Sequence, residues 1–302
     1  METAASGKST PSEGGDAVIT ITHPDRVIFP EANITKGALA DYYRKVGPAI
    51  LPWTASRLLS LVRCPQGRAR KCFFQKHDGG GFGPAVHHIS IVEKSGTPDD
   101  YLYVEDARGI LACVQMGTIE FHGWGARVED VERPDRVVFD LDPDTAIGFE
   151  AVKAAAVDLR ARLADIGFES FPLLTGGKGI HVVIPLTPGA GWEDAAGFAK
   201  GFAQAFAERE PDRFTATMSK AKRKGRIFID WLRNQRGATA IMPYSARARP
   251  GAPVAAPVSW KELDDIAKAC AFTVKDAETL LKRARSSTLA GWGVAVQRLP
   301  KT

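Results

Sequence analysis

The middle of the chain most constrains its fold, because strand-like and helix-like segments alternate there more regularly than elsewhere. Apolar residues follow helical spacing up to Gly167, a residue that commonly ends a helix. The segments are strands at 136–142, 170–175, 180–186 and 225–232, and helices at 149–166 and 192–208. Strands mixed with helices, some of them hairpin-linked, predict an α/β or α+β fold.

The flanking regions are predicted to belong to the same domain, residues 18–302. Thr35 is expected to cap a helix from Lys36 to about Val46, and two short helices are expected from Trp260 and Asp276. Further strands are predicted at 17–22, 57–64, 71–76, 101–106 and 117–124, with a helix at 107–116. Residues 1–17 are rich in Ser, Gly and Thr; they predict a disordered leader or interdomain linker, or a tail with no role.

Composition excludes several classes of protein. No apolar run approaches the roughly 18 residues of a membrane span, and the first residues lack the apolar core of a secretory signal. Four cysteines in 302 residues argue against a disulfide framework and favour a reducing, cytoplasmic setting. Cys64, Cys72 and His77 match no zinc module, so structural thiols are expected.

The charge distribution points to a polyanionic partner and a bound cation. The net charge of +5 is modest, but residues 57–77 hold six basic side chains and no acidic one. Residues 219–250 hold nine basic side chains and a single acid, Asp230, whereas acidic residues gather at 93–150. A basic surface beside an acidic pocket is typical of proteins that bind nucleic acid.

Asp140 and Asp142 are the sharpest chemical feature. Alternation along a strand directs both carboxylates to one face and Leu141 into the core. Two such carboxylates raise each other's pKa unless a cation lies between them, and hard divalent ions prefer oxygen ligands. The pair therefore indicates either a metal site or an Asp-rich turn at a solvated strand end. Asp230, which ends another apolar run, is either a third metal ligand or a salt-bridge partner; three carboxylates could hold two ions for phosphoryl transfer.

The loop between the strands at 170–175 and 180–186 suits a phosphate. Its glycines allow backbone N–H groups to approach closely, while Thr175, Lys178 and His181 offer a hydroxyl, a cation and a donor. The spacing is neither a Walker A loop nor a dinucleotide fingerprint. The alternative is a glycine hairpin with a core histidine.

Two further pairs are candidates for nucleic-acid contacts. Phe73 and Phe74 could stack on bases, although neighbouring strand residues face opposite ways, which predicts one in the core and one exposed. Arg247 and Arg249 alternate like the Asp pair and either grip phosphate or form a solvated basic edge.

Taken together, the blocks VVFDLDPD, TGGKGIHV, IFIDW and MPYSARARPGAPVAAPVSW resemble the archaeo-eukaryotic primase superfamily. The similarity is closest to the polymerase domain of bacterial end-joining DNA ligases, ligase D, and covers about residues 19–300. It implies a primase-like core with mixed, largely antiparallel sheets flanked by helices. It also implies a nucleotidyltransferase that uses two Mn²⁺ or Mg²⁺ ions to extend DNA 3′ ends and fill short gaps in non-homologous end joining, favouring ribonucleotides over deoxyribonucleotides.

The resemblance assigns roles by position. It implies catalytic, metal-binding carboxylates at Asp140, Asp142 and Asp230, and template contacts at Phe73 and Phe74. It implies nucleotide-binding residues at Arg63, His122, Thr175, Lys178, His181, Arg247 and Arg249. It also implies a pocket for a DNA 5′-phosphate at His23, Arg26 and Lys36, where His23 and Arg26 replace the more usual Asn and Lys.

Implied partners are DNA ends, gapped or nicked duplex, NTP or dNTP, a covalently linked ligase domain and a Ku-type protein, in the bacterial cytoplasm near the nucleoid. The sequence contains no ligase Lys-x-Asp-Gly motif. Two other functions stay open: a non-catalytic module that binds DNA ends, and a two-metal phosphodiesterase. The intact carboxylates argue against the first, and a phosphodiesterase would have no use for a triphosphate loop.

Overall fold

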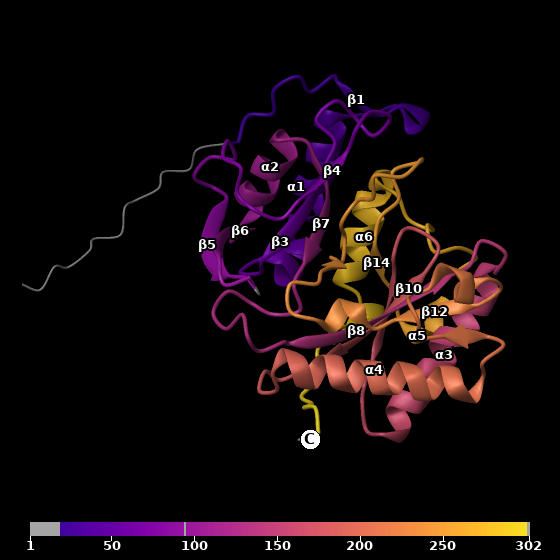
Figure 1. Ribbon diagram of the computed structural model, residues 1–302. Helices are drawn as coiled ribbons and strands as arrows, with labels where there is room; N and C mark the ends of the chain where they lie inside the picture. Colours follow the sequence, from indigo (N-terminus) through magenta and orange to yellow (C-terminus); the bar gives the residue numbers. More distant parts are fainter. Residues whose placement is uncertain (1–18, 94, 301–302) are drawn as a thin grey trace, which may run out of the picture.

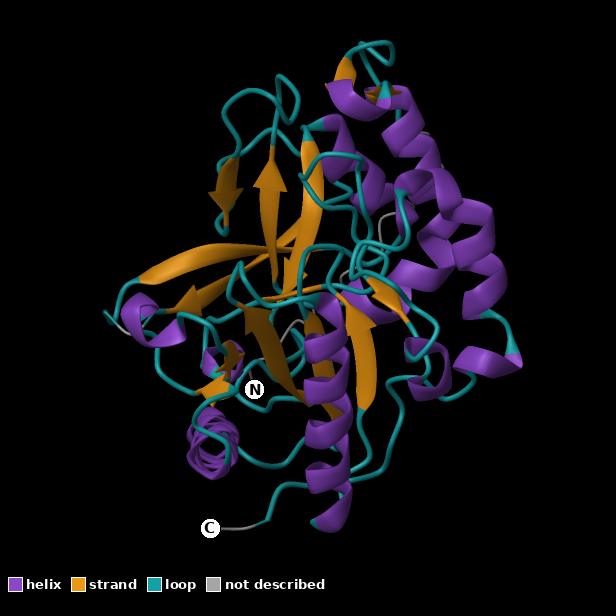
Figure 2. Ribbon diagram, turned by 90° about the vertical axis from the view of Figure 1, so that its right-hand side faces the viewer, coloured by secondary structure: helices purple, strands orange, loops and turns teal. Residues whose placement is uncertain are grey.

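The computed structural model describes residues 19–93 and 95–300, and it contains two six-stranded sheets with helices packed around them (Figure 1). The predicted leader, residues 1–17, lies outside the described residues. Figure 2 shows the strands of both sheets meeting near the middle of the molecule. The predicted α/β (α+β) class with largely antiparallel sheets is confirmed.

The C-terminal sheet has the strand order β11-β12-β8-β10-β9-β14 and is antiparallel except for the pair β11 and β12. Its strands are β8 (Arg136–Pro143), β9 (Phe171–Leu174), β10 (Ile180–Pro185), β11 (Phe214–Thr215), β12 (Ile227–Asp230) and β14 (Ala256–Pro257). Helices α3 (Phe149–Asp165) and α4 (Trp192–Arg209) pack on one face of this sheet (Figure 1). The apolar side chains of Val137, Phe139 and Leu141 lie in the core beneath these helices, so the alternate residues of β8 face the other side.

The N-terminal sheet has the order β13-β7-β3-β6-β5, with β4 paired to β3. Its strands are β3 (Leu59–Arg63), β4 (Phe73–Gln75), β5 (His87–Val92), β6 (Pro98–Tyr103), β7 (Thr118–Gly123) and β13 (Ala240–Ile241). Helices α1 (Lys36–Thr54), α2 (Ala107–Gln115) and α6 (Ala277–Ala284) pack together beside it. The remaining elements are β1 (Val27–Phe29), β2 (Ile34–Thr35), α5 (Trp260–Leu263) and short 3₁₀ helices η1 (Pro30–Ala32), η2 (Lys220–Arg223), η3 (Leu232–Asn234), η4 (Val274–Asp276) and η5 (Ser287–Leu289).

Three local expectations need correction. Thr35 does cap α1, by accepting from the Ala38 N–H, but the helix continues to Thr54 through two prolines instead of ending near Val46. A proline inside a helix costs roughly 3 kcal/mol, and the helix persists because its apolar face is buried against α2 and α6. Residues 19–22, the described part of the strand expected at 17–22, form no strand.

The expectation that Cys64 and Cys72 are free thiols is wrong, because they form a disulfide. The chain turns back after β3, so β4 pairs with β3 and the two cysteines meet at the mouth of the connecting loop, with Cα atoms 4.3 Å apart. Composition could not reveal this pairing, which depends on strand register. Within the described residues, no helix combines the length and apolar character required to cross a membrane.

Candidate active site

A cavity of about 240 Å³ opens where β8 and β10 meet the glycine loop between β9 and β10. It brings together eight side chains singled out from the sequence: His122, Asp140, Asp142, Thr175, Lys178, His181, Arg247 and Arg249. Gly177, Gly179, Arg233 and Ile241 complete the lining. Residues from four strands, two loops and one 3₁₀ helix therefore converge on one concave site, as a small-ligand site requires.

Strand register sets the positions of the three carboxylates. Asp140 on β8 lies opposite Asp230 on β12 on one side and opposite His181 on β10 on the other. Asp142 lies two residues further along β8 and shares the face of Asp140, whereas Leu141 is fully buried on the opposite face. Three carboxylates thus gather at one end of adjacent strands, as the alternation predicts for the pair on β8.

Two arginines that the sequence analysis did not single out bind these carboxylates. Arg233 lies 3.1 Å from an Asp140 oxygen and 3.3 Å from an Asp230 oxygen, so it bridges the two strands. Arg223 approaches Asp142 at 3.6 Å. Arg233 follows Asp230 by three residues on η3, a spacing that brings side chains onto the same side of a helical turn. That spacing was the one signal in the sequence for its role.

The carboxylates differ in pKa. Burial raises the pKa of Asp140, but His181 and Arg233 outweigh that effect and hold it well below its usual range. Burial, together with the charge of Asp140, raises the pKa of Asp142. Burial also raises the pKa of Asp230, against the opposing charge of Arg233. Two neighbouring carboxylates are expected to raise each other's pKa unless a cation lies between them. The pKa of Asp142 is raised in this way, whereas His181 and Arg233 stabilise the charge of Asp140.

The donor set fits a hard divalent cation on chemical grounds. Asp140 and Asp142 line the cavity, and Asp230 lies opposite Asp140 on the paired strand, so three carboxylates lie close together. Within residues 19–93 and 95–300, no three His, Cys, Asp or Glu side chains are already arranged around a common point as metal ligands. Arg223 and Arg233 occupy the carboxylates instead. The metal therefore stays a prediction.

The glycine loop is built around Thr175. Its hydroxyl donates to the Gly179 carbonyl at 2.9 Å and accepts from the Gly177 N–H at 3.3 Å. A Cβ on Gly179 would lie 2.2 Å from the Leu141 carbonyl oxygen, so only glycine lets this loop approach β8. Lys178 lies exposed at the tip of the turn and lines the cavity.

Glu120 on β7 is a residue that the sequence analysis missed. Its carboxylate lies 2.8 Å from Nε2 of His122 and 3.1 Å from Nε of Arg247, and it accepts from the Ala248 N–H at 2.7 Å. Burial raises the pKa of Glu120, but these partners outweigh it and lower the pKa to about 2. Burial lowers the pKa of His122. Glu120 precedes His122 by two residues, so the strand period already placed both on one face.

The aromatic pair on β4 departs from the expectation that one ring lies in the core. Phe73 and Phe74 are both exposed, at 41% and 48%. Arg63 covers Phe73, with its guanidinium 5.3 Å from the ring centre, and Phe74 lies edge-on to His122 at 5.5 Å. Arg63 itself donates to the Met116 carbonyl and to Gln75 and does not line the cavity. The rings therefore form an exposed platform beside the site.

His23, Arg26 and Lys36 lie together in the N-terminal segment, away from the cavity. The Arg26 N–H donates to the His23 carbonyl, and the Lys36 N–H donates to the Arg26 carbonyl. The Lys36 ammonium donates to the Thr22 carbonyl at 3.0 Å and to Gln115 at 2.7 Å. Burial and the nearby Arg26 charge lower the pKa of Lys36. Two cations held this close are suited to an anion.

Comparisons with known proteins agree with this architecture. The family model for the LigD primase-polymerase domain matches residues 35–288. The multifunctional non-homologous end joining protein LigD of Pseudomonas aeruginosa is 38% identical over 84% of this chain, and that of Mycolicibacterium smegmatis is 34% identical over 82%. The matched segments cover 30% and 32% of those two relatives, so the chain spans about a third of their length.

The fold also matches a solved structure, the polymerase domain of Mycobacterium tuberculosis ligase D in complex with DNA. The TM-score is 0.83 with 31% sequence identity, and the alignment covers 91% of this chain and 97% of that one. A family model over most of the chain, sequence relatives and a shared fold therefore agree on the family. The chain belongs to the LigD primase-polymerase domain family.

Proposed function

We propose that the chain is a nucleotidyltransferase that extends DNA 3′ ends and fills short gaps in non-homologous end joining. The observation that carries this proposal is the cavity in which Asp140 and Asp142 face Lys178, Arg247 and Arg249. A carboxylate wall opposite a cationic wall is what the transfer of a nucleotide from a triphosphate needs. The end-joining names of its relatives and the DNA bound to its structural neighbour support the same assignment.

In the proposed reaction the 3′-hydroxyl of a primer attacks the α-phosphate of an incoming nucleotide, and pyrophosphate leaves. Lys178, Arg247 and Arg249 bind the triphosphate and offset its charge. Thr175 shapes the loop that presents Lys178. His122 and His181 line the same cavity and supply donors. Most of the rate enhancement then comes from positioning and charge neutralisation.

Asp140 and Asp142 would hold two divalent ions, Mn²⁺ or Mg²⁺, and Asp230 would complete the site nearer the primer. When bound, such ions lower the pKa of the attacking hydroxyl and stabilise charge on the phosphates. The preference for ribonucleotides rests on the family resemblance.

DNA would contact two other surfaces of the chain. Phe73 and Phe74 are both partly exposed, and base–aromatic stacking contributes roughly 1–3 kcal/mol per base. Lys36 and Arg26, with His23, would bind the 5′-phosphate on the far side of a gap. In a longer parent protein this domain would be joined to a ligase domain and would act with a Ku-type partner.

Primer extension on a gapped duplex tests the proposal. The assay supplies Mn²⁺, compares NTP with dNTP, and uses substrates with and without the 5′-phosphate. We expect extension that depends on the metal and is faster with NTP than with dNTP. A 5′-phosphate on the downstream strand should increase the rate of extension. Asp140→Asn should abolish extension and largely preserve DNA binding.

Two outcomes would overturn this assignment. DNA binding without extension under any of these conditions would favour an end-binding module. Metal-dependent cleavage of the strand without nucleotide incorporation would favour a phosphodiesterase.

A further inference from the structure

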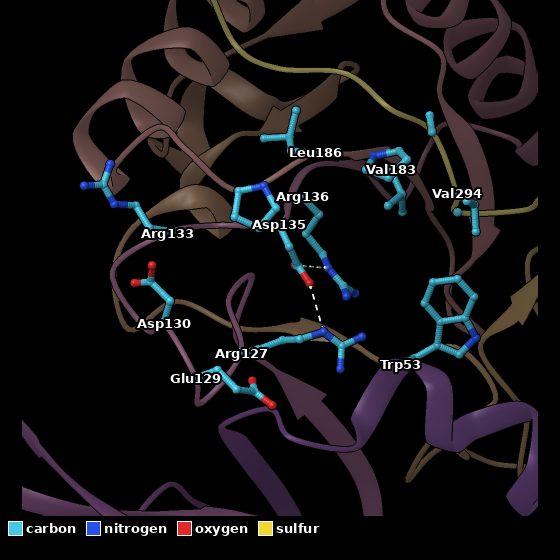
Figure 3. Close-up of a pocket in the computed structure, with 14 residues that line it drawn as sticks. Trp53, Arg127, Glu129, Asp130, Arg133, Asp135, Arg136, Val183, Leu186 and Val294 are labelled. Carbon is cyan, nitrogen blue, oxygen red and sulfur yellow. Dashed lines mark hydrogen bonds and ion pairs between the residues drawn. The ribbon is translucent and has the colours of Figure 1, made fainter.

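A second cavity, of about 490 Å³, lies at the other end of β8, where Arg136 begins the strand (Figure 3). Four residues of strand separate Arg136 from Asp140, or roughly 13 Å at the usual rise. The cavity wall is formed by Trp53 of α1, the loop that holds Arg127, the end of β10 with Val183, and the C-terminal segment with Val294. None of these residues belongs to the proposed polymerase site.

Arginines outnumber carboxylates by one around this cavity: Arg57, Arg127, Arg133 and Arg136 lie there with Glu129, Asp130 and Asp135. Three guanidiniums, those of Arg57, Arg127 and Arg136, surround the single carboxylate of Asp135 at 2.6, 3.6 and 3.0 Å. The Arg57 side chain is fully buried, and its burial and the charge of Arg136 lower its pKa. Excess charge in a buried cluster is costly unless a counter-ion is present. An anion in the cavity would supply that counter-ion.

Arg136 is the residue that would contact this anion. Its side chain is only 10% exposed, and its Nε donates to Asp135 at 3.0 Å. No described residue accepts a hydrogen bond from its two terminal nitrogens. Figure 3 shows the guanidinium pointing into the space between Arg127 and Trp53. A planar fork with two free N–H directions suits the oxygens of a carboxylate or phosphate.

The other residues that line the cavity indicate which chemical group is attached to the anion. Val183 and Val294 line the side of the cavity near Trp53, so an apolar group would be buried there. Glu129 and Asp130 lie on the opposite side, away from Trp53 (Figure 3). Those two carboxylates would repel an extended polyanion such as a nucleic-acid backbone. The cavity therefore suits a small anionic head group.

We propose that this cavity binds a small oxyanion, a phosphate or a carboxylate, that carries an apolar group. The head group would contact Arg136, and the apolar group would pack against Trp53 and Val294. This site is separate from the proposed nucleotide site and does not depend on polymerase activity.

Calorimetric titration with phenyl phosphate and with benzoate tests the proposal and distinguishes the two head groups. At least one of the two aromatic anions is expected to bind. Inorganic phosphate, which lacks the apolar group, and phenol, which lacks the anionic head group, are each expected to bind about tenfold more weakly. Absence of binding by both aromatic anions at about 10 mM would overturn the proposal. Equal binding of inorganic phosphate would overturn the role of the apolar wall.

Val294 and Val296 provide a matched pair of variants. Both are exposed, at 68% and 95%, in the same C-terminal segment, but only Val294 lines the cavity. Val294→Asp should weaken binding about tenfold by adding a like charge, whereas Val296→Asp should change it less than about twofold. Equal effects of the two substitutions would show that binding lies elsewhere.

A second pair tests the head-group contact. Arg136→Gln should weaken binding of the aromatic anion about tenfold. Arg298→Gln is the control, because it removes the same charge at an exposed position of the C-terminal segment that does not line the cavity. Circular dichroism confirms that both variants fold. An equal loss of affinity in the two variants would indicate general electrostatic attraction and would contradict the proposed contact with Arg136.

Discussion

Replacing Glu120 by Gln should lower the stability of the fold and remove part of its pH dependence. Glu120 is 8% exposed and, as a carboxylate, binds His122 and Arg247 and accepts from the Ala248 N–H. Hydrogen bonds to charged groups contribute about 1.5–3 kcal/mol each. Losing the charge while keeping the shape should therefore cost about 3 kcal/mol of unfolding free energy at pH 7, which corresponds to a melting temperature lower by about 5 °C for a chain of this size.

The lowered pKa of Glu120 expresses the same stabilisation as a dependence on pH. Its value of about 2, against 4.5 for an unperturbed Glu, stabilises the folded state above the unfolded pKa. A difference of about 2.5 units corresponds to roughly 3 kcal/mol. Because the folded pKa is lowered, this stabilisation is lost as the pH falls from about 5 towards 2, with about 2 kcal/mol gone by pH 3.

Urea unfolding of the wild type and Glu120→Gln at pH 7 and pH 3 measures both quantities. The difference in unfolding free energy should shrink by about 2 kcal/mol at the lower pH, because glutamine does not titrate. Glu278→Gln is the control, since Glu278 is 85% exposed and pairs only with Lys45 on the surface; its effect should stay within about 0.5 kcal/mol. A difference between wild type and Glu120→Gln that stays constant from pH 7 to pH 3 would refute the reasoning.

Three further predictions concern the loop, the N-terminal pocket and the disulfide. Gly179→Ala should lower stability and abolish nucleotide binding, because its Cβ would lie 2.2 Å from the Leu141 oxygen; wild-type nucleotide affinity in a folded variant would contradict this. Lys36→Met should remove the stimulation of gap filling by a 5′-phosphate and leave extension of an open primer unchanged, and a loss of both would place Lys36 elsewhere in the mechanism. Replacing Cys64 and Cys72 by serine should lower the melting temperature in non-reducing buffer, because an 8-residue separation predicts about 2–3 kcal/mol of stabilisation. The same variant should match the wild type in excess dithiothreitol, and a persisting difference would show that packing is the cause.

The sequence was most informative where a local pattern alone determines geometry. Strand alternation placed Asp140 and Asp142 on one face and Leu141 in the core, and the structure has this arrangement. The same rule failed for Phe73 and Phe74. It assumes a core on one side of the strand, and β4 is a three-residue strand paired only with β3 among the described strands, so neither ring is buried in a core.

Residues that act through distant partners were harder to predict. Glu120 and Arg247 are 127 positions apart, and their ion pair exists because β13 pairs with β7 and directs the following segment past that strand. Arg233 reaches Asp140 because β12 pairs with β8. Nothing local in the sequence encodes such strand order, so the pairing of one charge with another became visible only in the fold.

The charges of the site explain why a bound cation and a bound triphosphate are expected together. Around the cavity, five cationic side chains (Lys178, Arg223, Arg233, Arg247 and Arg249) lie with four carboxylates (Glu120, Asp140, Asp142 and Asp230). A single positive charge remains, which is less than a triphosphate needs for neutralisation. Arg223 and Arg233 are moreover bound to the three aspartates and are not free to bind phosphate. Divalent ions on the aspartates would supply the missing positive charge and would release both arginines, so the electrostatics of the chain itself favour a site in which metal and nucleotide bind together.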